Sequence, residues 1–270
     1  MNKFAVFGNP IAHSLSPTIH QMFARQHNLT ISYEKIGPEE ADFERSLHVF
    51  FAASDAIGCN VTSPFKGRAL QQADTLNNAA KLARAVNTLH RTDTGQLQGY
   101  NTDGIGLVAD IHNQGITLAN KKVLLIGAGG AARGAIHPLL DEGINTLAIT
   151  NRTMSRAEQI ASEVSHPAFM ALDKPGLMSF DADIIINTTS ASLHNQLPDL
   201  QHISFVKCEL AYDMAYSNEA TLYMERANQE GAAQSADGLG MLVEQAAAAF
   251  TIWTGKVPQT GPVIDALRQR

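Results

Sequence analysis

The sequence contains little cysteine. Cys59 and Cys208 are the only two in 270 residues, and they lie far apart with no neighbours at metal-ligand spacing. A disulfide framework or a structural zinc site needs several such residues at short intervals. Neither is therefore expected, both thiols are predicted to be buried, and no metal is needed.

Long hydrophobic runs are also missing. No stretch approaches the roughly 18 consecutive apolar residues that a membrane-spanning helix requires. The apolar run between Met1 and Gly8 is too short for a signal peptide. We therefore expect no membrane contact and a location in the cytoplasm.

The chain has no excess of positive charge. Its 26 acidic and 20 basic residues give a net charge of −6, which argues against nucleic acid or an anionic membrane as the main partner. Hydrophobic residues make up 44% and charged residues 17%, as is typical of a globular protein with substantial cores. A length of 270 residues allows two domains.

Short apolar runs alternate with helix-like stretches, which predicts an α/β fold. Strands are expected at 4–7, 31–35, 57–61, 86–89, 123–126, 146–150, 184–186 and around 210–212. Helices are expected after Pro17, from Glu39, after Ser63-Pro64, and at 103–113, 219–230 and 238–253. The last helix is expected to pack back onto the first domain.

The most informative segment runs from Lys121 to Arg156. A predicted strand leads into Gly127-Ala128-Gly129-Gly130-Ala131-Ala132, and a helix and a second strand follow. The spacing G-x-G-x-x-G/A allows a tight turn and close approach of the backbone to a pyrophosphate, at which the next helix points its first amides. The pattern predicts a dinucleotide site, whereas a simple tight turn is the alternative.

The residues after the second of these strands favour NADP over NAD. NAD enzymes usually place an acidic residue there for the ribose hydroxyls, but no acid lies between Gly143 and Ala157. The segment instead contains Asn151, Arg152, Thr153, Ser155 and Arg156. Guanidinium groups bind phosphate oxygens in a forked geometry, so these residues suit a ribose 2′-phosphate.

Lys66 is a candidate for proton transfer. A nicotinamide enzyme leaves hydride transfer to its cofactor, so the protein must orient the substrate and move one proton at its oxygen. Ser63 suits a helix cap and Pro64 the first helical position, which would place Lys66 in the first turn. A cation there opposes the helix dipole, which disfavours a purely structural choice. A solvated surface lysine is the alternative.

Asp103 is expected at the start of the 103–113 helix. An acid at this position has a ready structural explanation, because it favours the helix dipole. If Asp103 lies beside Lys66, however, the carboxylate would orient the lysine and exchange protons with it. The sequence does not show whether the two are close.

Other polar residues stand where a ligand or a structural partner would explain them. Ser16 precedes Pro17 and suits either substrate binding or a helix cap. Asn87 lies in a predicted strand, so its amide must face a ligand or a backbone partner. Gln245 shares a helix face with Gly238, which would permit close approach to its amide, and a surface glutamine is the alternative.

Taken together, these stretches resemble the shikimate dehydrogenase family, NADP-dependent enzymes that reduce 3-dehydroshikimate to shikimate. The resemblance covers nearly the whole chain. It rests on Gly8 to Pro10, Ser14 to Pro17, Asn60 to Lys66, Ala85 to Thr88, Gly99 to Asp103, Gly127 to Arg133, Asn151 to Thr153 and Gly240 to Gln245.

The resemblance implies a role for each matching residue. Lys66 would be the catalytic acid and base, with Asp103 beside it. The substrate would be held by Ser14, Ser16, Asn60, Thr62, Lys66, Asn87, Asp103, Tyr216 and Gln245. The cofactor would be held by Gly127, Ala128, Gly129, Gly130, Ala131, Asn151, Arg152, Thr153, Arg156, Met214 and Gly238.

The resemblance also implies the domain organisation. Residues 1–102 and 237–270 would form an N-terminal α/β substrate domain completed by C-terminal helices, and residues 103–236 a Rossmann-type NADP-binding domain. The chain departs from the family pattern at Ser192, where glycine is usual, at Ser217-Asn218, where Asn-Pro is common, and at Asn78, where an acid is frequent.

Two other functions are compatible with these motifs. A quinate/shikimate dehydrogenase using NAD is the nearest alternative, and the basic residues Arg152 and Arg156 argue against it. A non-catalytic NADPH sensor is the other, because a nucleotide fold alone does not establish a reaction. We expect a small-molecule substrate and a monomer or homodimer.

Overall fold

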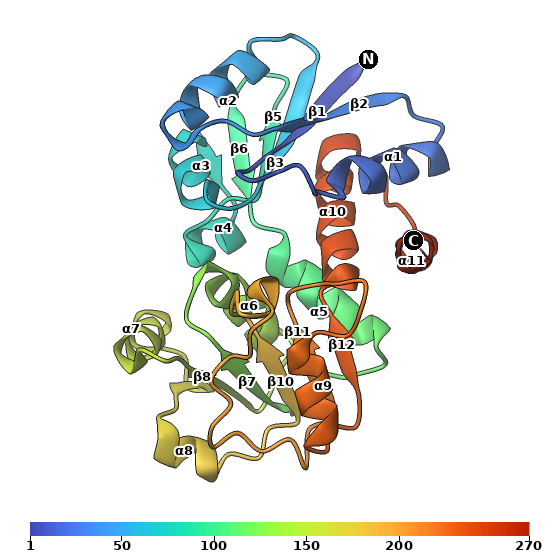
Figure 1. The fold of residues 1–270 in the computed structure, drawn as a ribbon. Helices are drawn as coiled ribbons and strands as arrows, with labels where there is room; N and C mark the ends of the chain where they lie inside the picture. Colours follow the sequence, from blue (N-terminus) through green and yellow to red (C-terminus); the bar gives the residue numbers. More distant parts are fainter. Residues whose placement is uncertain (270) are drawn as a thin grey trace. The chain divides into compact units, whose positions relative to one another are not determined.

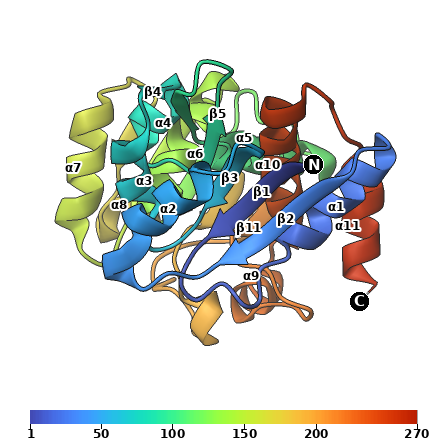
Figure 2. The same cartoon turned by 90° about the horizontal axis from the view of Figure 1, so that it is seen from above.

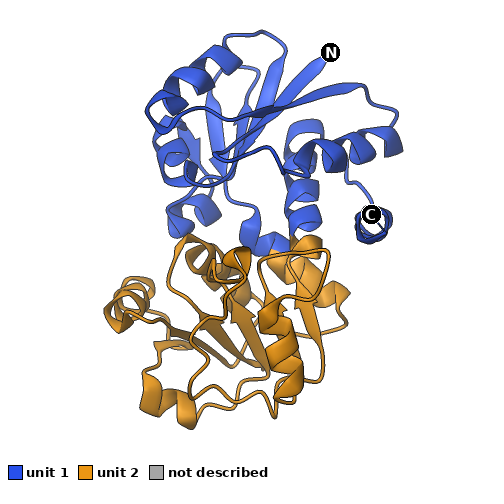
Figure 3. Ribbon diagram, viewed as in Figure 1, with its two compact units in different colours: residues 1–106, 242–270 blue, residues 107–241 orange. Residues whose placement is uncertain are grey.

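The computed structural model describes residues 1–269 and divides the chain into two compact units (Figure 3). Unit 1 comprises Met1–Gly106 and Leu242–Arg270, and unit 2 comprises Leu107–Met241. The chain passes between them in α5 (Asp103–Asn113) and α10 (Leu239–Thr254). The divisions expected after residues 102 and 236 fall close to these boundaries.

Unit 1 is built around a six-stranded mixed sheet in the order β2-β1-β3-β5-β6-β4. Its strands are β1 (Asn2–Phe7), β2 (Ile31–Ile36), β3 (Ala56–Val61), β4 (Thr75–Leu76), β5 (Thr88–Arg91) and β6 (Leu97–Tyr100). Its helices, apart from parts of α5 and α10, are α1 (Ser16–Gln26), η1 (Glu40–Asp42), α2 (Phe43–Phe51), α3 (Lys66–Gln72), α4 (Asn78–Ala83) and α11 (Gly261–Arg268).

Both faces of this sheet are covered, as the alternation along β1 requires. Phe7 packs with Phe43 of α2 on one face, whereas Phe4 stacks on Trp253 of α10 on the other, with ring centroids 4.9 Å apart. Figures 1 and 2 show α2 and α3 on one side of the sheet and α1 and α10 on the other. Gly58 leaves room for Trp253, since a Cβ there would lie 2.2 Å from the indole nitrogen.

Unit 2 contains a six-stranded, fully parallel sheet in the order β12-β11-β10-β7-β8-β9. Its strands are β7 (Lys122–Ile126), β8 (Thr146–Thr150), β9 (Phe169–Ala171), β10 (Ile184–Asn187), β11 (Leu210–Asp213) and β12 (Ser235–Asp237). Its helices are α6 (Gly130–Asp141), α7 (Met154–Val164), α8 (Lys174–Met178), η2 (Ser192–His194) and α9 (Leu222–Gln229). This is the Rossmann strand order, whose topological switch point lies between β7 and β10.

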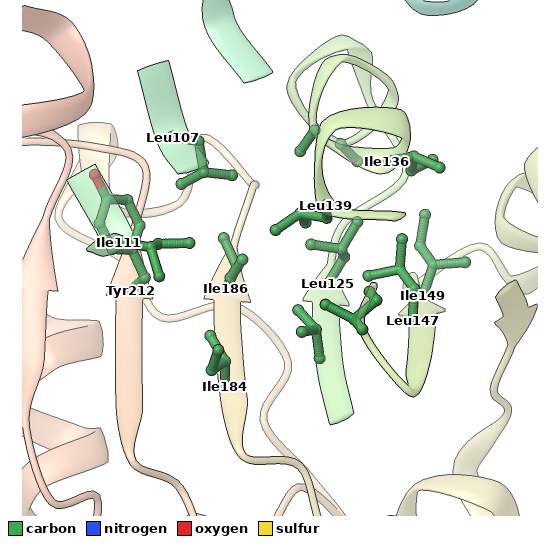
Figure 4. Packing of buried hydrophobic residues seen from close by; sticks show 14 of the residues in the cluster. Leu107, Ile111, Leu125, Ile136, Leu139, Leu147, Ile149, Ile184, Ile186 and Tyr212 are labelled. Carbon is green, nitrogen blue, oxygen red and sulfur yellow. The ribbon is translucent and has the colours of Figure 1, made fainter. Parts of the chain in front are cut away.

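Apolar residues fill both faces of the parallel sheet, as expected for strands buried between helices. Ile184 and Ile186 face the layer that contains Leu139 of α6 (Figure 4). Ile185 belongs to the other buried cluster, which contains Tyr223 of α9. The expected α/β fold is confirmed, and both cysteines are buried free thiols. Within residues 1–269, no helix combines the length and apolar character needed to cross a membrane.

Several expected element boundaries were wrong. The strand expected at 86–89 spans Thr88–Arg91, and the helix expected at Glu219 begins at Leu222, because Thr221 caps it. The Ser63–Pro64 peptide bond is cis, and the helix after it begins at Lys66, so Ser63 is not its cap. The short strands β4, β6, β9 and β12 were not predicted, because pairing with neighbouring strands stabilises them.

Candidate functional site

Lys66 and Asp103 form an ion pair in unit 1. Each is the first residue of its helix, α3 or α5, and the distance from Lys66 Nζ to Asp103 Oδ2 is 2.7 Å. The side chains are 31% and 16% exposed, respectively, so the pair is partly shielded from water yet accessible. The proximity that the sequence left open is therefore present. A lysine held in this way can donate a proton to a bound ligand.

Asn87 holds the second oxygen of Asp103. The backbone N–H of Thr102 donates to Asn87 Oδ1 at 2.9 Å, and because this group can only donate, it fixes the orientation of the amide. Asn87 Nδ2 consequently faces Asp103 and donates to its Oδ1 at 2.8 Å. Asn87 is 2% exposed, so this contact is made in a protected environment. Both oxygens of Asp103 are thus held by unit 1.

Gln245 of α10 completes this cluster. Its Nε2 donates to the carbonyl of Leu242 at 2.8 Å, which turns Oε1 toward Asn87 Nδ2 at 3.4 Å. Helix α5 approaches closely at Gly106, where a Cβ would lie 2.7 Å from the backbone nitrogen of Gln245. The oxygen of Gln245 is therefore presented to the cluster as an acceptor.

The glycine beside Gln245 was wrongly expected to be Gly238. Helix α10 begins at Leu239, so Gly238 precedes the helix and does not share a face with Gln245. A Cβ at Gly238 would instead lie 2.2 Å from the carbonyl oxygen of Met214. Gly106 was missed because it lies 139 positions before Gln245, and only the packing of α5 against α10 within unit 1 brings the two together.

Asn60 lies at the end of β3 and is also held by hydrogen bonds. Its Nδ2 donates to the carbonyl of Asn87 at 3.2 Å and to Thr88 Oγ1 at 3.0 Å. Its Oδ1 accepts a hydrogen bond from the hydroxyl of Tyr33 at 2.6 Å. The nitrogen has no further proton to donate, so this amide can interact with a ligand only as an acceptor.

The hydroxyls of Ser14, Ser16 and Thr62 follow the first and third strands. Because β1 and β3 are parallel neighbours, the segments after them begin at the same edge of the sheet. Ser16 is not the helix cap that was one of its two expected roles, since it is the first residue of α1. Ser14 Oγ instead accepts a hydrogen bond from the backbone N–H of Ser16 at 3.3 Å.

Unit 1 therefore offers two kinds of partner to a ligand. Asp103, Gln245 and Asn60 present oxygens that accept hydrogen bonds, as ring hydroxyl groups require. Lys66 and the serine hydroxyls can donate, as a ketone oxygen or a carboxylate requires. The arrangement suits a small acid that carries several hydroxyl groups.

The glycine turn of unit 2 follows β7. Gly127 is buried with a φ of +111°, and a Cβ there would lie 2.7 Å from Thr188 Oγ1, so no other residue fits without strain. No heavy atom lies within 4 Å of the Cβ position of Gly129 or Gly130, which leaves the backbone open to a ligand. Helix α6 begins here, and its first amides have no intrahelical acceptor. The turn is suited to a pyrophosphate.

A cavity of about 520 Å³ opens beside this turn. It is lined by Ile126, Gly127, Thr150, Asn151, Arg152, Met154, Asp173, Lys174, Leu177, Thr189, Ser190, Ala191, His194, Gln196, Leu197, Pro198, Asp199 and Gln201. These residues follow β7, β8, β9 and β10, at the carboxyl-terminal edge where parallel sheets bind their ligands. The volume is in the range of ordinary cofactor sites.

The lining of this cavity carries two cations and two carboxylates, which differ in the partners that they have within the protein. The side chains of Arg152 and Lys174 have no hydrogen-bond or ion-pair partner among residues 1–269. The two carboxylates are instead engaged by backbone amides: Asp173 accepts from Gly176 at 2.9 Å and Asp199 from Gln201 at 3.1 Å. The cations remain available for phosphate oxygens.

The remaining predicted cofactor residues lie outside the cavity lining. Arg156 is exposed on the first turn of α7, and Thr153 precedes that helix. Met214 and Gly238 follow β11 and β12, and Tyr216 is 38% exposed on the segment after β11. Lys174 was not predicted, although its position after a strand end, next to Asp173, is the signal that would have found it.

Ser192, one of the departures from the family pattern, contacts a buried carboxylate. Its Oγ donates to Asp213 Oδ2 at 2.6 Å, and the same oxygen accepts from Thr221 Oγ1 at 2.7 Å. Asn187 Nδ2 donates to the other oxygen at 3.1 Å. Burial raises the pKa of Asp213, and the Ser192 and Thr221 hydroxyls oppose this shift. The network ties the segments after β10 and β11 together.

These features define a class of protein. Unit 2 has a Rossmann sheet with an open glycine turn and a cavity containing Arg152 and Lys174 at its carboxyl-terminal edge, and a second α/β unit holds a lysine–carboxylate pair. This combination is typical of a nicotinamide-dependent oxidoreductase with a separate substrate-binding unit. Comparisons with known proteins give the family: the chain belongs to the shikimate dehydrogenases.

Three family models match successive parts of the chain. "Shikimate dehydrogenase substrate binding domain" matches residues 6–89, "Shikimate / quinate 5-dehydrogenase" matches residues 108–199, and "Shikimate 5'-dehydrogenase C-terminal domain" matches residues 238–268. The curated "Shikimate dehydrogenase (NADP(+))" of Alteromonas mediterranea is 52% identical over 99% of this chain and 96% of its own length.

Solved structures of similar proteins share the whole fold. An Ael1 enzyme from Pseudomonas putida is 41% identical with a TM-score of 0.93, and the match covers 99% of this chain and 98% of that one. Shikimate 5-dehydrogenase from Thermus thermophilus, solved in complex with NADP(H) and shikimate, is 30% identical with a TM-score of 0.89, covering 100% and 99% of the two chains.

Proposed function

We propose that this protein catalyses the reversible, NADPH-dependent reduction of 3-dehydroshikimate to shikimate, a step in chorismate and aromatic amino-acid biosynthesis. The observation that carries the proposal is the Lys66–Asp103 pair, 2.7 Å apart beside three hydrogen-bonding amides, in a member of the shikimate dehydrogenase family. The pair supplies what the protein must add to a nicotinamide cofactor, which is a positioned proton.

The residues of unit 1 would bind and protonate the substrate. Lys66 donates the proton to the ketone oxygen as it becomes a hydroxyl, and Asp103 holds the ammonium group in place. Asn60, Asn87, Thr62 and Gln245 are assigned to the ring hydroxyls, together with Tyr216, which belongs to unit 2, and Ser14 and Ser16 are assigned to the carboxylate. The acceptor oxygen of Asn60 supports this division, because both protons of its nitrogen are already donated within the protein and the oxygen cannot bind a carboxylate.

The residues of unit 2 would hold the cofactor. When bound, NADPH supplies the hydride that reduces the ketone carbon. The turn formed by Gly127, Ala128, Gly129, Gly130 and Ala131 would receive the pyrophosphate. Asn151, Arg152, Thr153 and Arg156 would bind the 2′-phosphate, and Met214 and Gly238 would lie near the nicotinamide. Arg152, which has no hydrogen-bond or ion-pair partner within residues 1–269, lines the cavity and supports the choice of NADP over NAD.

The domain roles follow from the same assignment. Residues 1–102 with 237–270 form the substrate-binding domain, and residues 103–236 form the NADP-binding domain. The match of residues 6–89 to a substrate-binding domain supports the first of these roles. The cytoplasmic location and the monomeric or dimeric state stay predictions.

The test is NADPH oxidation by the purified protein with 3-dehydroshikimate. We expect turnover that Lys66→Ala lowers by roughly 10²- to 10⁴-fold in kcat with a smaller change in KM, because the variant removes the proton donor. Lys81→Ala is the matched control, an exposed lysine of the same unit. An unchanged kcat in Lys66→Ala would remove Lys66 from the mechanism.

The same assay separates the two alternatives. Equal turnover with NADH, or preference for the keto acid that is reduced to quinate, would favour an NAD-dependent quinate/shikimate dehydrogenase. Tight NADPH binding without turnover of either acid would favour a sensor.

A further inference from the structure

A buried tyrosine lies directly behind the proposed substrate site. Tyr33 belongs to β2 and is 7% exposed, and its hydroxyl donates to Asn60 Oδ1 at 2.6 Å. The direction of this hydrogen bond is fixed, because Asn60 Nδ2 faces the carbonyl of Asn87, which can only accept. The hydroxyl proton of Tyr33 is thus committed to Asn60.

The environment of Tyr33 keeps this hydroxyl a donor. Burial raises the pKa of Tyr33 well above its ordinary value, with Ser16 acting in the opposite direction, so the phenol is not ionised near neutral pH. The ring of His20 stacks on that of Tyr33 with centroids 4.5 Å apart and an interplanar angle of 13°. His20 is fully buried, and burial lowers its pKa to about 3 although its interaction with Asn60 opposes this shift, so the stacking partner is uncharged near neutral pH.

Among the described residues, the hydrogen bonds of Asn60 leave one lone pair of Oδ1 without a donor, because neither ring nitrogen of the nearby His20 has a partner in hydrogen-bonding geometry. Both protons of Nδ2 are donated, to Asn87 and Thr88, and one of the two lone pairs of Oδ1 is taken by Tyr33. The remaining lone pair can accept only from a donor. A neutral hydroxyl fits, whereas a carboxylate would be repelled.

We propose that Tyr33 is a positioning residue for the substrate: its hydroxyl holds the Asn60 amide so that the free lone pair of Oδ1 accepts a hydrogen bond from one ring hydroxyl. The inference rests on the proposed function and deepens it, because it assigns the chemical group that Asn60 recognises and the residue that presents Asn60 to it. Tyr33 itself does not touch the substrate.

The test is the Tyr33→Phe variant, which retains the ring and its stack on His20. We expect KM for 3-dehydroshikimate to rise roughly tenfold, the effect of about one hydrogen bond, with kcat within about twofold and the dissociation constant of NADPH unchanged. Tyr100→Phe is the matched control, since it removes a hydroxyl of the same unit that donates to Gln98 at 2.7 Å and not to Asn60.

A double-mutant cycle distinguishes positioning from general destabilisation. In an Asn60→Ala background, Tyr33→Phe should leave KM unchanged, because its effect acts only through Asn60. Shikimate analogues that each lack one ring hydroxyl provide a second measurement: the analogue lacking the hydroxyl bound by Asn60 should bind both Tyr33→Phe and the wild type equally.

The experiments distinguish the positioning role of Tyr33 from the proposed reaction itself. An unchanged KM in Tyr33→Phe, or additive effects in the cycle, would overturn the positioning role while leaving the reaction intact. Absence of turnover by the wild-type protein would instead overturn the proposed function. If Tyr33→Phe folds poorly, as seen by thermal denaturation, the analogue comparison on wild type and Asn60→Ala still tests whether Asn60 binds a single hydroxyl.

Discussion

Asp103 uses its two carboxylate oxygens differently, with Oδ2 placed 2.7 Å from Lys66 Nζ while Oδ1 is held by a buried amide. The carboxylate is therefore held by a hydrogen bond that is independent of the lysine, and it can orient the ammonium group of Lys66. In the proposed reaction this arrangement positions the proton donor, so the pair should act as a unit.

Asp103→Asn should reduce kcat/KM by roughly 10²-fold or more, because the neutral amide no longer holds or balances the Lys66 ammonium group. Steady-state kinetics with 3-dehydroshikimate and NADPH would measure this. Glu34→Gln is the control, since Glu34 pairs with Lys3 at 3.1 Å on the surface, where ion pairs contribute little. Equal effects of the two variants would contradict a catalytic pair.

The free cations of the cofactor cavity should determine the preference for NADPH. Arg152→Ala should weaken binding of adenosine 2′,5′-bisphosphate by at least about tenfold and Lys174→Ala by several-fold, with little change for AMP, because only the bisphosphate carries the 2′ charge. Calorimetric titration with these two fragments measures this without requiring turnover.

The same titrations should be made with Arg156→Ala and with Lys122→Ala, which serves as the control. Arg156 was predicted to contact the 2′-phosphate but does not line the cavity, and Lys122 is an exposed cation of the same unit. A larger loss in Arg156→Ala than in Lys174→Ala would show that the cavity lining does not identify the phosphate site.

Gly106→Ala should damage substrate binding and stability together. The added Cβ would lie 2.7 Å from a backbone nitrogen of Gln245, and a backbone atom cannot move aside as a side chain can. We expect a loss of about 1–3 kcal/mol in the free energy of unfolding and a higher KM, because α5 and α10 must separate locally. Denaturant titration and kinetics measure the two effects. Gly261→Ala, where the new Cβ meets open space, should leave both unchanged.

Acidification should destabilise unit 1 through His20. Burial lowers the pKa of His20 from 6.5 to about 3, so the unfolded chain takes up a proton that the folded protein excludes. Above pH 6.5 His20 is neutral in both states and does not lower the free energy of unfolding. As the pH falls from 6.5 toward 3, the free energy of unfolding decreases by up to about 1.4 kcal/mol per pH unit. Urea denaturation at several pH values would measure the slope.

His20→Phe should remove that part of the pH dependence of the free energy of unfolding, because the phenylalanine ring can stack on Tyr33 in place of the imidazole but does not titrate. His13→Gln, which changes an exposed histidine, should keep the wild-type slope. A His20→Phe variant with the wild-type slope would show that another group carries the effect.

Sequence patterns correctly predicted the turns and helices that are determined by residues close together in the chain. The glycine turn at Gly127 and the helix that begins at Asp103 lie where the sequence placed them, because turn geometry and apolar periodicity involve residues close together in the chain. The same reasoning misplaced the start of β5 by two residues, because pairing with neighbouring strands decides that boundary. It also misplaced the cap of α3, which begins at Lys66 with Phe65 before it.

The sequence by itself determined the α/β rhythm, the dinucleotide turn, the basic residues after β8 and the identities of Lys66 and Asp103 as candidates. Tertiary structure alone decided that these two side chains meet, that Gly106 and not Gly238 lies against Gln245, and that Tyr33 orients Asn60. The physical reason is the same in each case: the direction of a hydrogen bond and the approach of two helices depend on residues distant in the chain, which only the packing of the folded sheet and its helices brings within bonding distance.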